Sequence, residues 1–407
     1  MPDVRDLTIA YVHKDGRLAA TLTREGTGTT FQYLPEYLAD DTVPIGTTLP
    51  LTDRPVATPG RSVPAFFAAL LPEGRRLTAL RTSLKVSADD ELSMLLAVGA
   101  DPVGDIAVTA TPEPPTPEEP VAASNGWGDL RFADLVGGLG IGDPSTLAGV
   151  QDKVSGRMIT VPLTRAASSY LLKLTPPEFP HLAANEAFFR RHAQALPMTT
   201  VHWEIVRDRD DVEGLLIHRF DRIPTPAGVL RLPAEDATQL LDRYPADKYN
   251  VSAEAVATAV AAACASAPLA RRSIFVQVAW AWLTGNGDLH AKNVSVVGTA
   301  PTLGGSRAVE MVMAPVYDIP STLPYRDFEV ALPIDGRRDG ITGRRLLAFA
   351  QAIGLPDRAA ASALAATMLA AETMVDDIRT GGSPWRGKQA DDLMKQLEFR
   401  HAQLAID

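Results

Sequence analysis

Three residues of this chain have the types and the order that phosphoryl transfer needs. Residues 286–293 read Asn-Gly-Asp-Leu-His-Ala-Lys-Asn, so Asn293 follows Asp288 by five positions, and Asp318 comes later in the chain. Phosphoryl transfer requires attacking and leaving oxygens held in line and neutralised phosphate charge, which Mg²⁺ on hard oxygen ligands supplies. We predict that Asp288 orients the acceptor hydroxyl and takes its proton, while Asn293 and Asp318 hold Mg²⁺.

Other residues of segment 286–293 admit two interpretations. Lys292 is predicted to act in catalysis as a point charge near the transferred phosphoryl group, and His290 to order the loop beside the cofactor by hydrogen bonds. The alternative is a plain turn that ends the preceding helix, because Asn, Gly and Asp all favour turns. That interpretation suits Asn286 and Gly287, but a turn requires neither the Asp-to-Asn spacing nor a later Asp.

A lysine on a predicted strand and a glutamate on a predicted helix extend the pattern. Residues 169–174 form an apolar run broken only by Lys173, and residues 182–192 have helical character with Glu186 in the first turns. In protein kinases such a pair positions the α- and β-phosphates of ATP. A strand lysine is usually just solvated, so the downstream motif is what makes Lys173 and Glu186 candidates for cofactor binding.

Residues 145–153 occupy the place of a phosphate-covering loop. They read Ser-Thr-Leu-Ala-Gly-Val-Gln-Asp-Lys and match no standard phosphate-binding signature, although the backbone N–H groups of such a turn still cradle phosphate. The nearby segment Gly137–Gly140 lacks the Lys and Ser/Thr of a P-loop and is predicted to be a flexible turn. The cofactor-binding candidates in the loop are Ala148, Gly149, Val150, Gln151 and Lys153.

Residues 214–222 read as a strand that runs into a charged turn. This is a natural place for a hinge between two lobes that holds the adenine, with His218, Arg219 and Phe220 as candidates. Arg219 and Asp221 form a structural ion pair in the alternative interpretation, and the residues alone do not decide between the two.

Composition limits the class of protein. A chain of 407 residues with 46% hydrophobic and 22% charged residues fits an ordinary globular protein of two or three domains. A formal net charge of -10 argues against a general nucleic-acid binder. The single cysteine, Cys264, predicts a reducing compartment and a small core residue. Without a signal-peptide core or a long apolar run, we expect a cytoplasmic protein.

The order of expected elements predicts an α+β protein. Residues 1–110 predict a small α+β domain, with strands at 7–12, 18–22 and 104–109, a turn at Asp15-Gly16, and helices at 63–71 and 89–98. A Pro/Glu-rich connector is expected at 111–126 and a small lobe at 127–223. Residues 224–407 predict a mainly helical C-terminal lobe, with helices at 251–266, 271–284 and 359–378 and a strand at 293–297. Trp280 and Trp282 are expected in its core.

The chain resembles the HipA family of serine/threonine kinase toxins from bacterial type II toxin–antitoxin modules. Segments 66–74, 147–153, 215–222, 286–293 and 314–318 carry the resemblance, and residues 233–239 and 247–249 are similar to two further family signatures. The resemblance implies a protein-kinase-like fold of two lobes with an added N-terminal domain, and Mg²⁺ and ATP as cofactors. It also implies a HipB-like DNA-binding antitoxin as partner. An aminoacyl-tRNA synthetase is the implied class of substrate.

Carried over by position, the resemblance makes Lys173 the ATP-phosphate lysine, Asp288 the base, and Asn293 and Asp318 the Mg²⁺ ligands. It also implies an autophosphorylated hydroxyl in the loop, where Thr146 aligns and Ser145 is its neighbour. A phosphate there adds about two negative charges beside the ATP pocket, and their repulsion would eject the loop.

Two other classes stay open from the sequence. A small-molecule kinase would share the Asp-to-Asn loop and differ in the acceptor pocket, while an inactive ATP- or partner-binding protein need not keep all four kinase residues. Zinc chemistry is disfavoured because the seven histidines show no paired spacing. We expect the N-terminal domain to lie apart from the ATP residues, which makes it a candidate for antitoxin contact.

Overall fold

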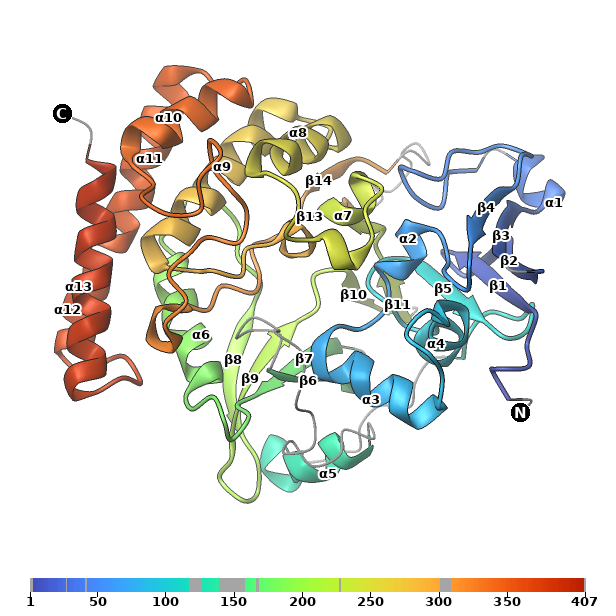
Figure 1. Cartoon of the computed structure of the whole chain (residues 1–407). Helices are drawn as coiled ribbons and strands as arrows, with labels where there is room; N and C mark the ends of the chain where they lie inside the picture. Colours follow the sequence, from blue (N-terminus) through green and yellow to red (C-terminus); the bar gives the residue numbers. More distant parts are fainter. Residues whose placement is uncertain are drawn as a thin grey trace.

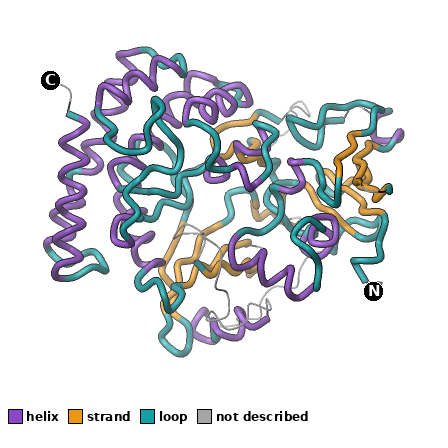
Figure 2. The backbone as a smooth tube through the Cα atoms, viewed as in Figure 1, coloured by secondary structure: helices purple, strands orange, loops and turns teal. Residues whose placement is uncertain are grey.

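Three groups of elements make up the molecule, and they are arranged around one central region (Figure 1). The N-terminal domain lies on one side, the helical C-terminal lobe on the opposite side, and the small lobe below and between them. Figure 2 shows the strands concentrated in the first and the last of these groups. The computed structural model describes residues 3–26, 28–40, 42–116, 126–138, 158–165, 168–226, 228–300 and 309–405.

The N-terminal domain is built on an antiparallel sheet in the order β4-β3-β2-β1-β5. The predicted Asp15-Gly16 turn joins the first two strands, and both residues have positive φ, 49° and 73°, as the tight hairpin turn requires. Side chains such as Phe31 and Phe67 fill the core between sheet and helices. The strands are β1 (Ile9–Lys14), β2 (Arg17–Glu25), β3 (Gly28–Tyr33), β4 (Val56–Pro59) and β5 (Ile106–Thr109).

The helices of this domain differ in part from expectation. The helix predicted over residues 63–71 is a single turn, because it starts after Pro64 and the chain must leave helical geometry before Pro72. The predicted second helix is confirmed, with the Asp90 side chain accepting from Ser93 N as its cap. Sequence reasoning missed α3. The helices are α1 (Pro35–Leu38), α2 (Ala65–Ala68), α3 (Gly74–Leu84) and α4 (Glu91–Val98).

The small lobe is an antiparallel sheet in the order β6-β7-β9-β8, with α6 (Leu182–Ala193) against it. The predicted strand that carries Lys173 and the predicted helix that carries Glu186 are both confirmed. Part of the predicted 137–140 turn is the end of α5 (Phe132–Gly138), and residues 139–140 lie outside the described ranges. The strands are β6 (Ile159–Arg165), β7 (Ser168–Leu174), β8 (Trp203–Arg207) and β9 (Glu213–His218).

Short strands join the small lobe to the helical lobe. A hairpin of β10 (Arg222–Thr225) and β11 (Gly228–Arg231) precedes a sheet in the order β12-β13-β14. The strand predicted at 293–297 begins two residues later, because residues 291–293 form a 3-10 turn. The elements of this region are β12 (Ala234–Asp236), α7 (Ala237–Leu240), β13 (Ser295–Gly298) and β14 (Met311–Met313).

The C-terminal lobe packs its helices around α9 (Ala267–Thr284), whose Trp280 and Trp282 are buried in the core as predicted. The helix predicted over 359–378 is divided at Glu372 into α11 and α12. Cys264 is half-buried at the end of α8. The other helices are α8 (Ala253–Ala263), α10 (Gly343–Ala352), α11 (Asp357–Ala371), α12 (Thr373–Arg379) and α13 (Gly387–Leu404). Within the described ranges, no helix is both long and apolar enough to cross a membrane.

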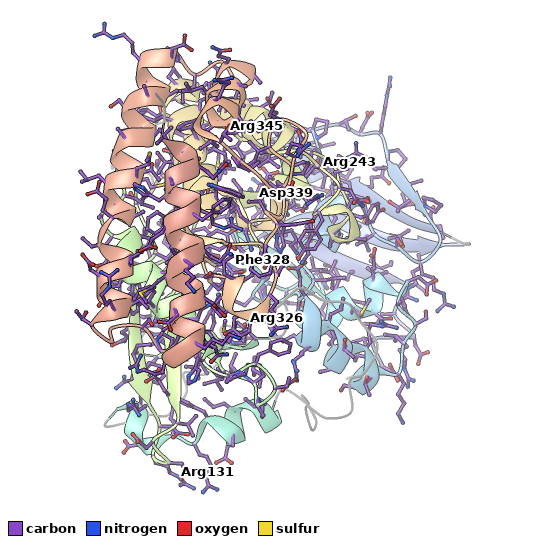
Figure 3. All side chains as sticks on the ribbon, turned by 60° about the vertical axis from the view of Figure 1, so that its left-hand side comes forward. Arg131, Arg243, Arg326, Phe328, Asp339 and Arg345 are labelled. Atoms are coloured by element: carbon purple, nitrogen blue, oxygen red, sulfur yellow. The ribbon has the colours of Figure 1, made fainter. Side chains whose placement is uncertain are left out.

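The loop that leads to α10 lies beside the last helix. Figure 3 brings α13 forward, and the labelled Arg326, Phe328 and Asp339 mark the course of this loop behind it, with Arg345 in the first turn of α10. The buried Arg400 of α13 fixes the contact, because its guanidinium donates to the carbonyl oxygens of Trp282 and Phe328. One side chain therefore joins α13 to both the central helix and the loop.

Candidate active site

Predicted site residues from distant parts of the chain line a cavity of about 380 Å³ between the lobes. The small lobe contributes Lys173 from β7, and the C-terminal lobe contributes Asp288, His290 and Asp318. The N-terminal domain forms a third wall, which residues 69–73 and 101–103 line together with Arg76 and Val98. The prediction that this domain lies apart from the ATP residues is therefore wrong, since the cavity is built from all three parts of the chain.

Lys173 and Glu186 form the ion pair that the sequence predicts. The Lys173 Nζ lies 2.8 Å from Glu186 Oε2 and 2.5 Å from Asp318 Oδ1. Burial alone would lower the pKa of Lys173, but the carboxylates of Asp318 and Glu186 outweigh it and the pKa lies above its ordinary value. Likewise, Lys173 overcomes the effect of burial on Asp318 and lowers the pKa of that carboxyl. Lys173 and Asp318 therefore each favour the charged form of the other.

Arg190 joins this cluster, and sequence reasoning missed it. Its Nε donates to Glu186 Oε1 at 2.9 Å, so Glu186 serves two cations. The Arg190 side chain is 1% exposed and lines the cavity, and its Nη1 has no hydrogen-bond partner among the described residues. The signal was present in the sequence, because residues four apart on a helix share a face and Arg190 follows Glu186 by four positions.

The catalytic loop starts where α9 ends. Gly285 ends the helix in the left-handed region, with φ 62°, and Asn286 Oδ1 then accepts from Asp288 N at 2.9 Å. A Cβ on Gly287 would lie 2.6 Å from Thr322 Oγ1 and 2.7 Å from Glu329 O, so the chain approaches too closely for any other residue. The turn interpretation therefore holds for Asn286 and Gly287, and the turn presents Asp288 to the cavity.

Asn293 ties together the two acidic positions. Its Nδ2 donates to Asp288 O at 2.9 Å and to Asp318 Oδ2 at 3.1 Å. The amide oxygen of Asn293 and the carboxylate of Asp318 are hard oxygen donors of the kind Mg²⁺ prefers. In the described parts of the chain no group of three or more His, Cys, Asp or Glu side chains could hold a metal ion. A two-ligand site fits Mg²⁺, because this ion usually keeps water and substrate phosphates in its shell.

Lys292 lies at the cavity but is held by the N-terminal domain. Its Nζ donates to Ala69 O at 2.8 Å and lies 3.9 Å from Glu73 Oε1. Lys248 Nζ pairs with the same Glu73 oxygen at 2.9 Å. Burial alone would raise the pKa of Glu73, but Lys292 and Lys248 lower it to about 2. The structure shows Lys292 bound to Ala69 of the N-terminal domain. Its predicted role beside the transferred phosphoryl group therefore stays a proposal.

Replacing Glu73 with Gln is expected to lower the melting temperature, because Lys248 and Lys292 lose their shared counter-charge. A lowered pKa contributes stability that is complete above the ordinary value of 4.5 and is lost as the pH falls towards about 2. The difference in melting temperature from wild type should therefore be full at pH 7 and shrink across that interval. Glu36→Gln, at an exposed position of the same domain, is the control; a difference independent of pH would contradict the assignment.

The proposed hinge is divided between the two interpretations. Arg219 is the structural ion pair of the alternative, with Nη2 2.8 Å from Asp221 Oδ2 and Nη1 2.6 Å from Asp101 Oδ2. Asp101 belongs to the N-terminal domain, so this network also attaches that domain to the hinge. His218, Arg219 and Phe220 all line the cavity, so Arg219 satisfies both interpretations, and the Phe220 ring stacks at 5.5 Å on Tyr317. The candidates Ser145, Thr146, Ala148, Gly149, Val150, Gln151 and Lys153 lie outside the described residues.

The two further signature segments attach the N-terminal domain to the helical lobe. In segment 233–239, the Glu235 carboxylate accepts from the backbone N–H and the hydroxyl of Thr47, and Gln239 Nε2 donates to Phe66 O at 3.1 Å. In segment 247–249, Lys248 binds Glu73 as described and the Tyr249 hydroxyl donates to Asp288 Oδ1 at 2.7 Å. The sequence predicted none of these contacts, because each joins residues that are far apart in the chain.

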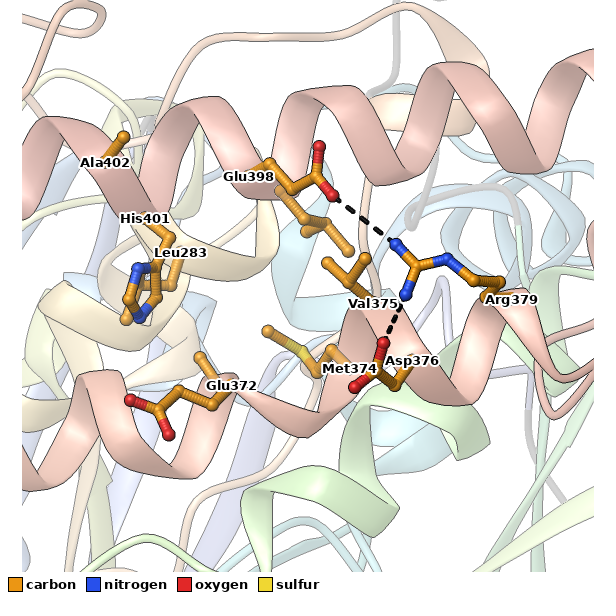
Figure 4. Close-up of a pocket in the computed structure, with 11 residues that line it drawn as sticks. Leu283, Glu372, Met374, Val375, Asp376, Arg379, Glu398, His401 and Ala402 are labelled. Carbon is orange, nitrogen blue, oxygen red and sulfur yellow. Dashed lines mark hydrogen bonds and ion pairs between the residues drawn. The ribbon is translucent and has the colours of Figure 1, made fainter.

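A second hollow, of about 340 Å³, lies between α12 and α13 (Figure 4). Apolar side chains including Met374, Val375 and Leu397 line it. Arg379 bridges Asp376 and Glu398 at its edge, the latter at 3.7 Å. None of the predicted site residues lines this hollow, so the cavity between the lobes is the candidate active site.

Fold and site together define a protein-kinase-like chain with an added N-terminal domain. Residues 10–109 match the HipA N-terminal domain and residues 145–375 match the HipA-like C-terminal domain. The chain therefore belongs to the HipA family, as the resemblance in its sequence predicted.

Individual relatives agree with this assignment. The serine/threonine-protein kinase toxin HipA of Shewanella oneidensis is 28% identical over 77% of this chain and 76% of its own length. The kinase-named protein Y4dM of Sinorhizobium fredii is 30% identical over 81% of this chain and 80% of its own. Among solved structures, HipA of Shewanella oneidensis, in a complex with HipB and operator DNA, superposes with a TM-score of 0.74 at 22% identity over 97% of both chains. That last likeness shows that the fold is shared along almost the whole chain.

Proposed function

We propose that this protein is a serine/threonine kinase toxin that transfers the γ-phosphoryl group of ATP to a hydroxyl of another protein. The observation that carries the proposal is that Lys173, Asp288 and Asp318 line one cavity between two lobes, with Glu186 paired to Lys173 and Asn293 bonded to Asp318. The family membership and the names of the relatives support the same activity.

In this proposal the chain's own residues hold both substrates and move one proton. Lys173, fixed by Glu186, binds the α- and β-phosphates, while Asn293 and Asp318 hold the metal. Mg²⁺, when bound, neutralises charge on the phosphates. The acceptor oxygen forms a bond to the γ-phosphorus, the bond from that phosphorus to the β,γ-bridging oxygen breaks, and ADP leaves. The acceptor proton passes to the carboxylate of Asp288, which the loop holds in place through Asn286 and Asn293.

Two partners follow from the proposal. A HipB-like DNA-binding antitoxin would restrain the kinase, because the HipA chain of similar fold is found in a complex with HipB and operator DNA. The acceptor would be a protein of translation, for which an aminoacyl-tRNA synthetase is the proposed class. The cellular compartment in the proposal is the cytoplasm, where ATP and such substrates occur.

Arrest of growth on expression without an antitoxin tests the toxin proposal. We expect wild type to arrest a bacterial host, and Asp288→Asn to be tolerated at the same protein level. Phosphopeptide analysis of the arrested cells then identifies the acceptor by the sites that appear with wild type alone. Equal growth with wild type and variant would contradict the proposal.

Autophosphorylation in the loop is the second part of the proposal. Replacing both Ser145 and Thr146 with Ala is expected to abolish self-labelling within the loop, because these are the hydroxyls that align with the family's modified position. Mass spectrometry of the peptide that spans both residues, after incubation with Mg²⁺ and ATP, checks it. The variants with only one of the two residues replaced show which hydroxyl carries the phosphate. If the loop of the double variant is still labelled as strongly as in wild type, neither Ser145 nor Thr146 is the modified residue.

A further inference from the structure

Arg190 places a second cation on the glutamate that holds Lys173. Its Nε donates to Glu186 Oε1 at 2.9 Å, and its Nη2 donates to the same oxygen. Lys173 Nζ also donates to that oxygen at 2.9 Å, and to Oε2 at 2.8 Å. One buried carboxylate therefore binds two cations, and the kinase pattern accounts only for the lysine.

The two cations reach Glu186 from different elements. Arg190 and Glu186 lie one turn apart on α6, so the helix forms their bond by itself. Lys173 comes from β7, and its Nζ also lies 2.5 Å from Asp318 Oδ1. The lysine thus divides its charge between two carboxylates, whereas both hydrogen-bonded nitrogens of Arg190 bind Glu186.

Burial makes the balance of these charges important. Glu186 is 0% exposed, Arg190 1% and Lys173 9%, so water screens their charges poorly. Lys173 and Arg190 contribute two positive charges, and the carboxylates of Glu186 and Asp318 contribute two negative ones. The cluster of these four residues is therefore neutral with Arg190 and carries one excess negative charge without it.

A nucleotide that enters the cavity meets this cluster with its phosphates. Lys173 and Arg190 both line the cavity. In the proposed mechanism Asp318 holds the metal, so Lys173 turns from Asp318 to the phosphates. Glu186 then needs a counter-charge of its own, because otherwise its negative charge would offset that of Lys173 next to an anionic ligand.

We propose that Arg190 is a positioning residue for nucleotide binding, which neutralises Glu186 so that Lys173 presents its full positive charge to the phosphates of ATP or ADP. The assignment rests on the proposed kinase function and adds a residue to it. Arg190 acts through Glu186, since its Nε and Nη2 bind that residue and its Nη1 is buried. A direct contact between Arg190 and the phosphates is the competing explanation that the test must separate.

The first step of the test measures the binding of ADP with Mg²⁺, and of adenosine, to the full chain by calorimetry. Arg190→Met removes the charge and keeps a long, flexible side chain. We expect its affinity for ADP to fall about ten-fold, because the excess negative charge repels the phosphates. Adenosine carries no phosphate, so its affinity should not change. A defect in the fold would weaken both ligands together, and melting temperatures are recorded for each variant.

The second step restores the charge balance without the arginine. In the double variant Arg190→Met, Glu186→Gln, the glutamine oxygen can still accept from Lys173 but carries no charge. We expect this protein to bind ADP within about three-fold of wild type, because the cluster is neutral again. A phosphate contact made by Arg190 itself would not be restored in this way.

Arg191→Met is the matched control. Arg191 is the next residue of α6, but its side chain is exposed and pairs with Asp377 at 3.4 Å. The same chemical change there should alter the affinity for neither ADP nor adenosine.

Several outcomes would overturn the assignment. Wild-type ADP affinity in Arg190→Met would leave Arg190 with a structural role only, and tighter binding would mean that it competes with Lys173 for Glu186. An affinity that stays ten-fold weaker in the double variant would indicate direct phosphate contact, and this comparison decides even if Arg190→Met alone does not fold. Wild type that binds neither ATP nor ADP would overturn the kinase function as well, whereas the other outcomes leave that function intact.

Discussion

Replacing Asp288 with Asn is expected to lower the rate of phosphoryl transfer by about 10²–10⁴-fold, the usual contribution of a positioned general base. The amide cannot take the acceptor proton. Its Oδ1 still accepts from Tyr249, and the backbone bonds to Asn286 and Asn293 do not involve the changed atoms, so the loop should keep its shape. Single-turnover transfer from labelled ATP measures the rate, and calorimetry measures ATP binding, which should stay as in wild type.

Asp339→Asn is the matched control for this experiment. Asp339 is exposed on the loop before α10, where its nearest cation is Arg337 at 3.9 Å, so the same chemical change there should leave both rate and binding unaltered (Figure 3). An Asp288→Asn protein that transfers phosphate within ten-fold of wild type would contradict the assigned role of Asp288. A variant that no longer binds ATP would instead show that the loop had moved.

Replacing Lys173 with Met should affect both stability and activity. Lys173 is 9% exposed and lies between the carboxylates of Glu186 and Asp318, which the variant leaves buried with less counter-charge. Removing one partner of such a buried charge cluster lowers the free energy of unfolding by about 3–5 kcal/mol. We expect a value at the lower end of this range, because Arg190 still neutralises Glu186 in the variant. Denaturant unfolding at pH 7 measures this loss.

The same variant should bind ATP more weakly and transfer phosphate at least about 10²-fold more slowly, because the phosphates lose their lysine. Lys395→Met, at an exposed position of α13, is the control and should leave stability and rate unchanged. A stable Lys173→Met protein with wild-type ATP affinity would show that the lysine serves neither purpose. A protein that is unstable but binds ATP normally would assign Lys173 to the fold alone.

The parts of the site that the sequence predicted are those written in short segments. The Asp288-to-Asn293 spacing lies within one loop, and the strand and helix that carry Lys173 and Glu186 have their own local patterns. The Asp15-Gly16 hairpin was predictable for the same reason, because the turn residues themselves determine its geometry.

Contacts between distant segments had no such signal. Lys292 bonds to Ala69, which is 223 positions away, and the motif around Lys292 gives no indication of that partner. The lysine was therefore predicted at a phosphoryl group, and the N-terminal domain was placed apart from the site. Arg219 shows the same limit, because one of its two carboxylate partners, the half-buried Asp101, is 118 positions away.

The most direct test of the kinase account is incubation of the purified chain with Mg²⁺ and γ-labelled ATP, beside Asp288→Asn, followed by mass spectrometry of the peptide that contains Ser145 and Thr146. The account predicts label on that peptide in wild type and none in the variant. Wild type that binds ATP and transfers no label to any hydroxyl, or equal label in both proteins, would contradict it.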